Sequence, residues 1–186
     1  MAARSVVDIM NQLLTDWDTP RVPRYLQEEA NLSIEMPERC SAEKSERPLL
    51  VEDGIPEDLR ELWDSFSSAK LFEDVNYGQW GLEIFDYETS NQRTREFNRE
   101  RPQDAADGDR VIGRFIGDLD LLLIRCNPRE SDFGSIVVAI RDGFRKEWYR
   151  PASSLSSFLE EYASYDGQKY WETQFKGRKG PSAPPN

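Results

Sequence analysis

Histidine is absent from all 186 residues of the chain, and this absence excludes several kinds of chemistry at once. Histidine is the usual general base near neutral pH and the commonest metal ligand. Without it, Ser-His-Asp and Cys-His catalytic arrangements and the usual zinc sites cannot form. The phosphate-binding patterns G-x-x-x-x-G-K-[ST] and G-x-G-x-x-G are missing as well. Carboxylate-only catalysis and magnesium binding stay open, but we expect no enzymatic activity, no metal and no cofactor.

Cysteine and long apolar runs are also scarce. The two cysteines, Cys40 and Cys126, lie far apart in the sequence, and we expect free thiols because no export signal is visible. Apolar runs such as residues 121–124 are far shorter than the roughly 20 residues that a membrane span needs. The N-terminal residues lack the apolar core of a secretory signal. These features predict a cytoplasmic protein without a membrane partner.

Positive charge is in deficit, with a formal net charge of −11. Residues 53–109 hold 15 acidic and 6 basic side chains, a net of −9. A field of this sign repels nucleic acid and attracts basic proteins. Two interpretations stay open, because the acidity either keeps the protein soluble or forms a surface that docks a basic partner.

Apolar residues at helical spacing predict three helices. The first covers residues 5–17, with Ser5 as its cap. The second covers residues 56–68, with Pro56 in its first turn. The third covers residues 154–164, and we expect Trp63 and Phe158 to be buried on two of these helices. Residues 18–53 contain four prolines and little periodicity, which indicates a linker or an irregular wrap with a short strand at 49–51.

Alternation of apolar and polar residues predicts strands between the second and third helices. The expected strands cover residues 79–87, 111–116, 119–125, 135–141 and 144–149. Asp142-Gly143 is a typical type I′ hairpin turn, and Gly117-Asp118 predicts another tight turn. Residues 88–109 are polar and indicate a long surface loop, with a helical turn near 92–98. The predicted fold class is α+β, a mostly antiparallel meander with helices packed on one face.

The order of these motifs resembles the SUKH superfamily, which includes bacterial toxin-immunity proteins and a fungal regulator of cell-wall synthesis. The motifs that carry the resemblance are Gly54-Ile55-Pro56, Trp80-Gly81-Leu82, Ile112-Gly113, Gly117-Asp118 and Ser157-Phe158-Leu159. The resemblance covers about residues 50–165, and it implies that Gly54, Pro56, Trp80, Gly81 and Gly117 are scaffold positions. We therefore expect an N-terminal helix with an irregular extension (1–49), a SUKH-like domain (50–165) and a C-terminal tail (166–186) with a disordered end.

The candidate partner-binding residues combine acidic and aromatic side chains: Glu73, Asp74, Glu83, Asp86, Glu88, Trp148 and Tyr149. The acidic residues surround the first expected strand, and of the adjacent Trp148 and Tyr149 one should be buried and the other exposed. Asp118 and Asp120 form a D-x-D pair that is either a magnesium site or a turn aspartate followed by an exposed one, and we favour the second interpretation. Arg141, Arg145, Lys146 and Arg150 form a basic cluster around the last expected hairpin.

The resemblance implies a binding protein with no catalytic set. The first hypothesis is an immunity protein that neutralises a cognate toxin, expected to be basic, by direct binding. The alternative is a regulatory or scaffolding module without a toxin partner. An unrecognised enzyme is the third and least favoured hypothesis.

Overall fold

Seven antiparallel strands form one sheet in the part of the chain that the computed structural model describes, residues 4–28, 35–46 and 53–175. The strand order follows the chain, so each strand pairs with the next one. The strands are β1 (Glu38–Lys44), β2 (Phe66–Asp74), β3 (Leu82–Ile84), β4 (Asp109–Phe115), β5 (Leu121–Arg125), β6 (Ile136–Ala139) and β7 (Tyr149–Ala152). The helices are α1 (Val6–Asp16), α2 (Arg24–Glu28), α3 (Glu57–Ser65), α4 (Tyr87–Glu100), α5 (Leu155–Ser164) and α6 (Tyr170–Phe175). This architecture confirms the predicted α+β class with an antiparallel meander.

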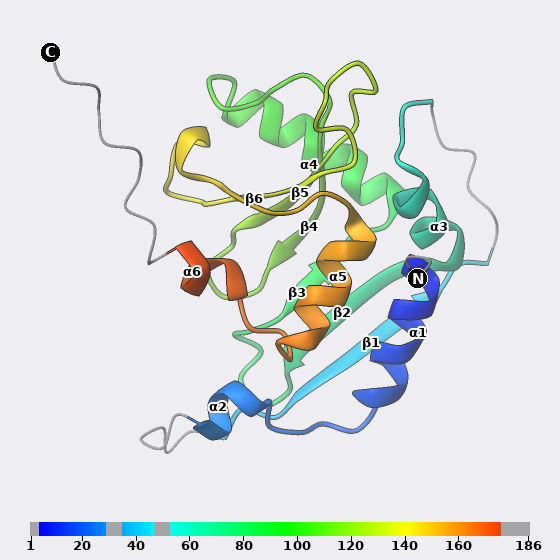
Figure 1. Cartoon of the computed structure of the whole chain (residues 1–186), viewed down its shortest axis with the longest axis vertical. Helices are drawn as coiled ribbons and strands as arrows, with labels where there is room; N and C mark the ends of the chain where they lie inside the picture. The colour runs from blue at the N-terminus through cyan, green and yellow to red at the C-terminus, as the bar shows by residue number, and fades with distance from the viewer. Residues whose placement is uncertain (1–3, 29–34, 47–52, 176–186) are drawn as a thin grey trace, which may run out of the picture.

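Three helices, α1, α3 and α5, cover one face of the sheet, whereas α4 crosses the opposite face (Figure 1). The larger apolar cluster lies under the three helices and includes Trp63 and Phe158, which are 1% and 0% exposed as expected. The Trp63 indole donates a hydrogen bond to the Phe85 carbonyl at 2.9 Å. A smaller cluster lies under α4 around Phe97 and Val111. The prediction that the helices at 56–68 and 154–164 pack on one face of the sheet is therefore confirmed, and α4 adds an unpredicted helix on the opposite face.

The first and third predicted helices are confirmed, and Ser5 caps α1 by accepting a hydrogen bond from the Asp8 amide at 3.2 Å. The second ends earlier than expected, at Ser65, because Phe66 has extended dihedral angles and begins β2. That strand escaped prediction because the aromatic stripe of α3 continues into it. Phe66 is buried on the strand and not on the helix.

The segment expected to be irregular contains α2 and the edge strand β1. β1 pairs antiparallel with β2 from Glu38 to Lys44, and Arg21 forms a further β-bridge to Glu38. The expectation of a linker or irregular wrap is therefore wrong for residues 38–44. The proposed strand at 49–51 lies outside the described residues.

The predicted surface loop at 88–109 is also wrong, because residues 87–100 form α4. Asp86 begins this helix by accepting hydrogen bonds from the amide and hydroxyl of Thr89 at 2.6 and 2.8 Å. Only Ser90 and Phe97 are buried along its 14 residues. A helix that buries so few side chains has almost no apolar stripe to detect.

The predicted hairpin at Asp142-Gly143 does not form. A type I′ turn needs positive φ at both central residues, and neither of these residues has it. The expected strand at 144–149 is replaced by a 3-10 turn over Arg145–Glu147, and β7 begins at Tyr149. Residues 140–148 instead fold over the face that α4 covers, where Trp148 joins the smaller apolar cluster.

The turn at Gly117-Asp118 is present between β4 and β5. Gly117 has a φ of +102°, and a Cβ atom there would collide with the Gln79 carbonyl of the neighbouring turn. Leu119 has a φ of +66°, so β5 begins at Leu121 and not at residue 119. The two turns at this end of the sheet are therefore packed backbone to backbone, which supports the scaffold role expected for Gly117.

Candidate functional site

On the face of the sheet opposite α1, α3 and α5, none of the helices in the described residues covers β1, β2 and β3, since α4 contacts β4. Its side chains are polar because alternate residues of these strands point away from the larger core. They surround a hollow of about 350 Å³. We call this surface the open face, and its polar residues are Arg39, Ser41, Glu43, Ser68, Lys70, Glu73 and Glu83.

A second hollow, of about 340 Å³, lies between α4 and the strands β4 to β6. We call it the α4 hollow. Its lining combines apolar side chains with charged ones: Phe85, Arg93, Glu96, Phe97, Glu100, Arg101, Arg114, Leu119, Leu121, Ala139 and Arg141. The two hollows are neighbours, because Arg114 lines one and its ion-pair partner Glu83 lines the other.

One cross-strand row connects the two hollows. Adjacent strands place the following residues directly opposite one another, from β1 to β6: Ser41, Lys70, Glu83, Arg114, Leu121 and Ala139. Directly opposed residues of antiparallel strands point to the same face. The row therefore changes from polar on the open face to apolar beneath α4, and the Glu83–Arg114 ion pair of 2.6 Å marks the change.

Of the five predicted acidic residues, Glu73 and Glu83 lie on the open face, where Glu73 pairs with Lys70 at 2.5 Å. Asp74 is 1% exposed and anchors the turn between β2 and β3, since its carboxylate accepts hydrogen bonds from three turn amides. Asp86 caps α4, and Glu88 is exposed in its first turn. Asp74 and Asp86 therefore stabilise a turn and a helix end. The structure does not bring all five acidic residues together in one hollow.

Trp148 is 8% exposed and Tyr149 is half-buried. The Trp148 ring packs on Phe97, and the guanidinium groups of Arg101 and Arg145 lie 5.2 and 5.3 Å from its ring centre. Its indole nitrogen donates a hydrogen bond to the Gly143 carbonyl at 3.1 Å. Trp148 thus fixes the 140–148 segment onto the sheet.

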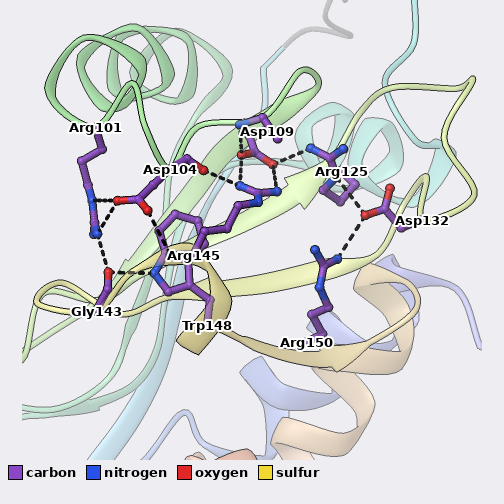
Figure 2. A network of polar contacts seen from close by, with 10 residues as sticks. Arg101, Asp104, Asp109, Arg125, Asp132, Gly143, Arg145, Trp148 and Arg150 are labelled. Carbon is purple, nitrogen blue, oxygen red and sulfur yellow. Dashed lines mark hydrogen bonds and ion pairs between the residues drawn. The ribbon is translucent and has the colours of Figure 1, made fainter. Parts of the chain in front are cut away.

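A network of arginines and aspartates holds the same segment in place (Figure 2). The fully buried Asp109 carboxylate binds both Arg125 and Arg145, each with a closest distance of 2.5 Å. Asp104 accepts hydrogen bonds from the Arg145 amide and the Arg101 guanidinium, and these contacts lower its pKa. Arg101 also donates to the carbonyls of residues 140, 141 and 143, so the network joins the end of α4 to the segment that follows β6.

The predicted basic cluster is divided by this network. Arg145 belongs to it, and Arg150 reaches its edge through Asp132 at 3.1 Å. Lys146 is exposed. The Arg141 side chain is exposed at the rim of the α4 hollow and makes no hydrogen bond or ion pair with any described residue.

Asp118 and Asp120 face a buried cation from the C-terminal segment. The Lys169 side chain is 5% exposed, and its ammonium group binds Asp118 and lies 3.5 Å from Asp120. It also lies 4.7 Å from the centre of the Phe115 ring. The pair therefore anchors Lys169, and residues 4–28, 35–46 and 53–175 contain no group of three or more acidic or cysteine side chains placed to hold a metal ion.

A buried acid at the start of β1 was not anticipated. Glu38 is 0% exposed, and its Oε1 atom accepts a hydrogen bond from the Tyr25 hydroxyl at 2.7 Å. Burial, with help from the nearby Asp74 and Asp166 carboxylates, raises the pKa of Glu38 to about 8. The two thiols are similarly suppressed, because burial raises the pKa of Cys40 to about 12 and that of Cys126 to about 11. Both cysteines are free, as expected.

Sequence reasoning missed Arg39, Glu43 and Lys70 on the open face and Arg93 and Arg114 in the α4 hollow as site residues, and it named Arg141 only as part of a basic cluster. The signal that places the strand residues among them is their position in the strand register. That register becomes visible only when β1, β2 and α4 are recognised as elements.

Comparison with known proteins gives one match. The family model described as "SMI1 / KNR4 family (SUKH-1)" matches residues 54–161, which is more than half of the chain. Searches of curated proteins and of solved structures gave no significant match. None of the helices in the described ranges has the length and apolar character needed to cross a membrane.

Proposed function

Since the chain belongs to the SMI1 / KNR4 family (SUKH-1), we propose that it is a non-enzymatic binding protein that neutralises a cognate bacterial toxin by direct contact. The mechanism is occlusion, in which the protein covers the toxin's active surface. The family is generally non-catalytic. The carboxylates of Asp109, which binds two arginines, and of Asp118 and Asp120, which face Lys169, form ion pairs within the fold, which supports a structural role for these acids.

The observation that carries this proposal is the row from Ser41 to Ala139. A sheet face that no described helix covers, that carries charges of both signs and that borders an apolar hollow has the composition of a protein interface, with a polar area beside an apolar centre. The partner would rest on the open face and reach into the α4 hollow. Glu73 and Glu83, two of the residues expected to bind the partner, lie in this area.

The net charge of −11 supports a basic partner. Such a field accelerates encounter with a positively charged protein, whereas the close contacts of the interface determine how long the complex lasts.

The test is rescue from toxicity. The proteins encoded next to this gene are expressed one at a time in a bacterial host, with and without this chain. We expect one of them to arrest growth, this chain to restore growth, and the two to co-elute as a complex. Restored growth without a complex, or a complex with a non-toxic protein alone, would contradict neutralisation by binding, and the second result would point to a regulatory or scaffolding module.

A further inference from the structure

We propose that the α4 hollow is the anchor pocket of the interface, and that it receives an apolar side chain of the partner protein together with an adjacent carboxylate. The inference deepens the proposed function, because it specifies the chemistry of the partner residue that enters this pocket. It does not depend on the partner's overall charge.

The floor of the α4 hollow consists of apolar side chains that are buried. Phe85, Phe97 and Ala139 are 5%, 4% and 1% exposed, so the floor is part of the smaller core. Leu121 lies beside them, and Leu119 stands at the rim with 42% of its surface exposed. A volume of about 340 Å³ is at the lower end of the range for ligand pockets. It accommodates one side chain the size of leucine or phenylalanine with its neighbouring backbone.

The walls are fixed before any partner arrives. Near the start of α4, the Ser90 hydroxyl donates to the Val111 carbonyl at 2.7 Å, and the Val111 amide donates to the Thr94 hydroxyl at 3.0 Å. Beyond its end, Arg101 donates to the Ile140 carbonyl at 3.0 Å. A pocket pinned on both sides loses little conformational entropy when it is filled, which favours tight binding.

The rim recognises a carboxylate. Four arginines and two glutamates line the hollow, in a protein whose net charge is strongly negative. Arg93, Arg101 and Arg114 each have an acidic partner within the chain, at 2.9, 2.8 and 2.6 Å. The Arg141 guanidinium has no such partner among the described residues, although its backbone amide is fixed by Asp120 at 2.9 Å. A guanidinium group that has no acidic partner of its own offers two parallel donors to a carboxylate.

The location favours a protein side chain over a free small acid. The α4 hollow is continuous with the open face across the Glu83–Arg114 pair, so a protein that rests on the open face places its own side chains over the hollow. A small acid in the same hollow is covered on one side only. Specific interfaces concentrate their binding energy in such central, largely desolvated pockets.

The experiment uses three blocked tripeptides as probes: acetylated and amidated Asp-Leu-Asp, Asp-Ala-Asp and Lys-Leu-Lys. Each is titrated into the isotope-labelled full chain, and amide chemical shifts are recorded. We expect Asp-Leu-Asp to shift amides of residues 93–101, 119–121 and 139–141. Asp-Ala-Asp should bind at least ~10-fold more weakly, because most of the leucine side chain is missing. Lys-Leu-Lys should also bind more weakly, because the arginines repel it.

A variant and a matched control complete the test. Arg141→Gln should weaken Asp-Leu-Asp binding by roughly 10-fold, the usual loss for one hydrogen bond to a charged group. Arg129→Gln, an exposed arginine beyond the other end of β5, should leave binding unchanged. Shifts that are absent, lie elsewhere or are equal for all three probes would overturn the anchor pocket. So would equal affinity for isovalerate, since the hollow would then be a small-acid site.

The two proposals fail separately. If a toxin is bound and neutralised while no tripeptide enters the hollow, only the anchor pocket is wrong. If Asp-Leu-Asp enters the hollow as expected and none of the neighbouring gene products is bound, the proposed function is wrong and the pocket serves another protein.

Discussion

The Nη1 atom of Arg145 lies 2.5 Å from Oδ2 of Asp109, whose side chain is completely buried. Arg145 belongs to the segment between β6 and β7, whereas Asp109 begins β4, so this contact fixes the segment to the far side of the sheet. The same carboxylate also neutralises Arg125. Asp109 is therefore one of two buried acids, with Asp104, that hold the 140–148 segment, which forms part of the α4 hollow.

Replacing that acid should be costly. We expect Asp109→Ala to lower the free energy of unfolding by about 3–5 kcal/mol, because it leaves two largely buried arginines without their main partner. Chemical denaturation measures the loss. Asp132→Ala is the matched control, since Asp132 is 31% exposed and also binds Arg125. It should cost about 1 kcal/mol or less. Equal losses for the two variants would show that burial of Asp109 does not determine its contribution.

The core prediction concerns Trp63 and Phe158. We expect alanine at either position to cost about 3–5 kcal/mol, because each leaves a large cavity between the helices and the sheet. Tyr77→Ala, at a side chain that is 59% exposed, should change stability by less than about 0.5 kcal/mol. Thermal and chemical unfolding both report the effect, and similar melts for all three variants would place the helix stripes in solvent.

Glu38 should make stability depend on pH. Its pKa rises from an ordinary value of 4.5 to about 8 in the folded protein, so between these values the folded state holds a proton that the unfolded state has lost. Stability from this group is therefore fully present below about pH 4.5 and is lost as the pH rises through about 8. One pKa unit corresponds to about 1.4 kcal/mol, so the whole effect is on the order of a few kcal/mol.

Glu38→Gln tests this effect, because the amide oxygen still accepts the Tyr25 hydrogen bond and the side chain does not ionise. We expect the variant to gain stability relative to the original protein as the pH rises from 5.5 to 9. The measurement is the difference between the two unfolding free energies at each pH. A difference that stays constant across this range would mean that Glu38 ionises normally.

The open face should control the rate of association with the toxin. We expect the triple variant Glu43→Gln, Glu73→Gln and Glu83→Gln to slow association about 3–10-fold at low salt, since it removes three open-face charges that attract a basic partner. The two rates should converge at high salt, where the Debye length falls to about 3 Å. Stopped-flow kinetics measures both. Asp74 and Asp86 are left intact, because they cap a turn and a helix.

The control removes the same number of charges elsewhere, through Asp18→Asn, Glu130→Gln and Glu160→Gln at exposed positions. Its association rate should stay closer to that of the original chain. If both triple variants are equally slow, only net charge matters; if neither is slow, the acidic residues of the open face do not steer the partner.

The sequence pattern predicted a helix or strand correctly where one face of that element is strongly apolar. It predicted α1, α3 and α5 and most of the central strands, because Leu62, Phe158 and their neighbours recur at the period of their element. It failed for β1 and α4. In β1 the outward residues Arg39, Ser41 and Glu43 are polar and the inward ones include Glu38, so no apolar alternation is visible. In α4 only Phe97 and the small Ser90 are buried.

The candidate site was the least predictable part. Asp74 and Asp86 resembled free surface acids, because a sequence does not show which carboxylates have backbone amides to bind. The sequence predicted that one of Trp148 and Tyr149 is buried but not which one, and the structure buries Trp148 because the segment that carries it folds inward. The row through Glu83, Arg114 and Leu121 depends on the register of neighbouring strands, which no single strand reveals.

The order of strands at the edge of the sheet also determines which fragment of the chain should be produced for experiments. The family match begins at residue 54, after β1, and β1 is the strand that shields one side of the nine-residue β2. A fragment cut to residues 54–161 would present β2 as a bare sheet edge, an arrangement that invites strand-to-strand aggregation. The N-terminal strand β1 thus protects the edge of β2 from pairing with another molecule. We expect the fragment 54–161 to precipitate and a longer fragment that also retains residues 4–46 to stay monodisperse.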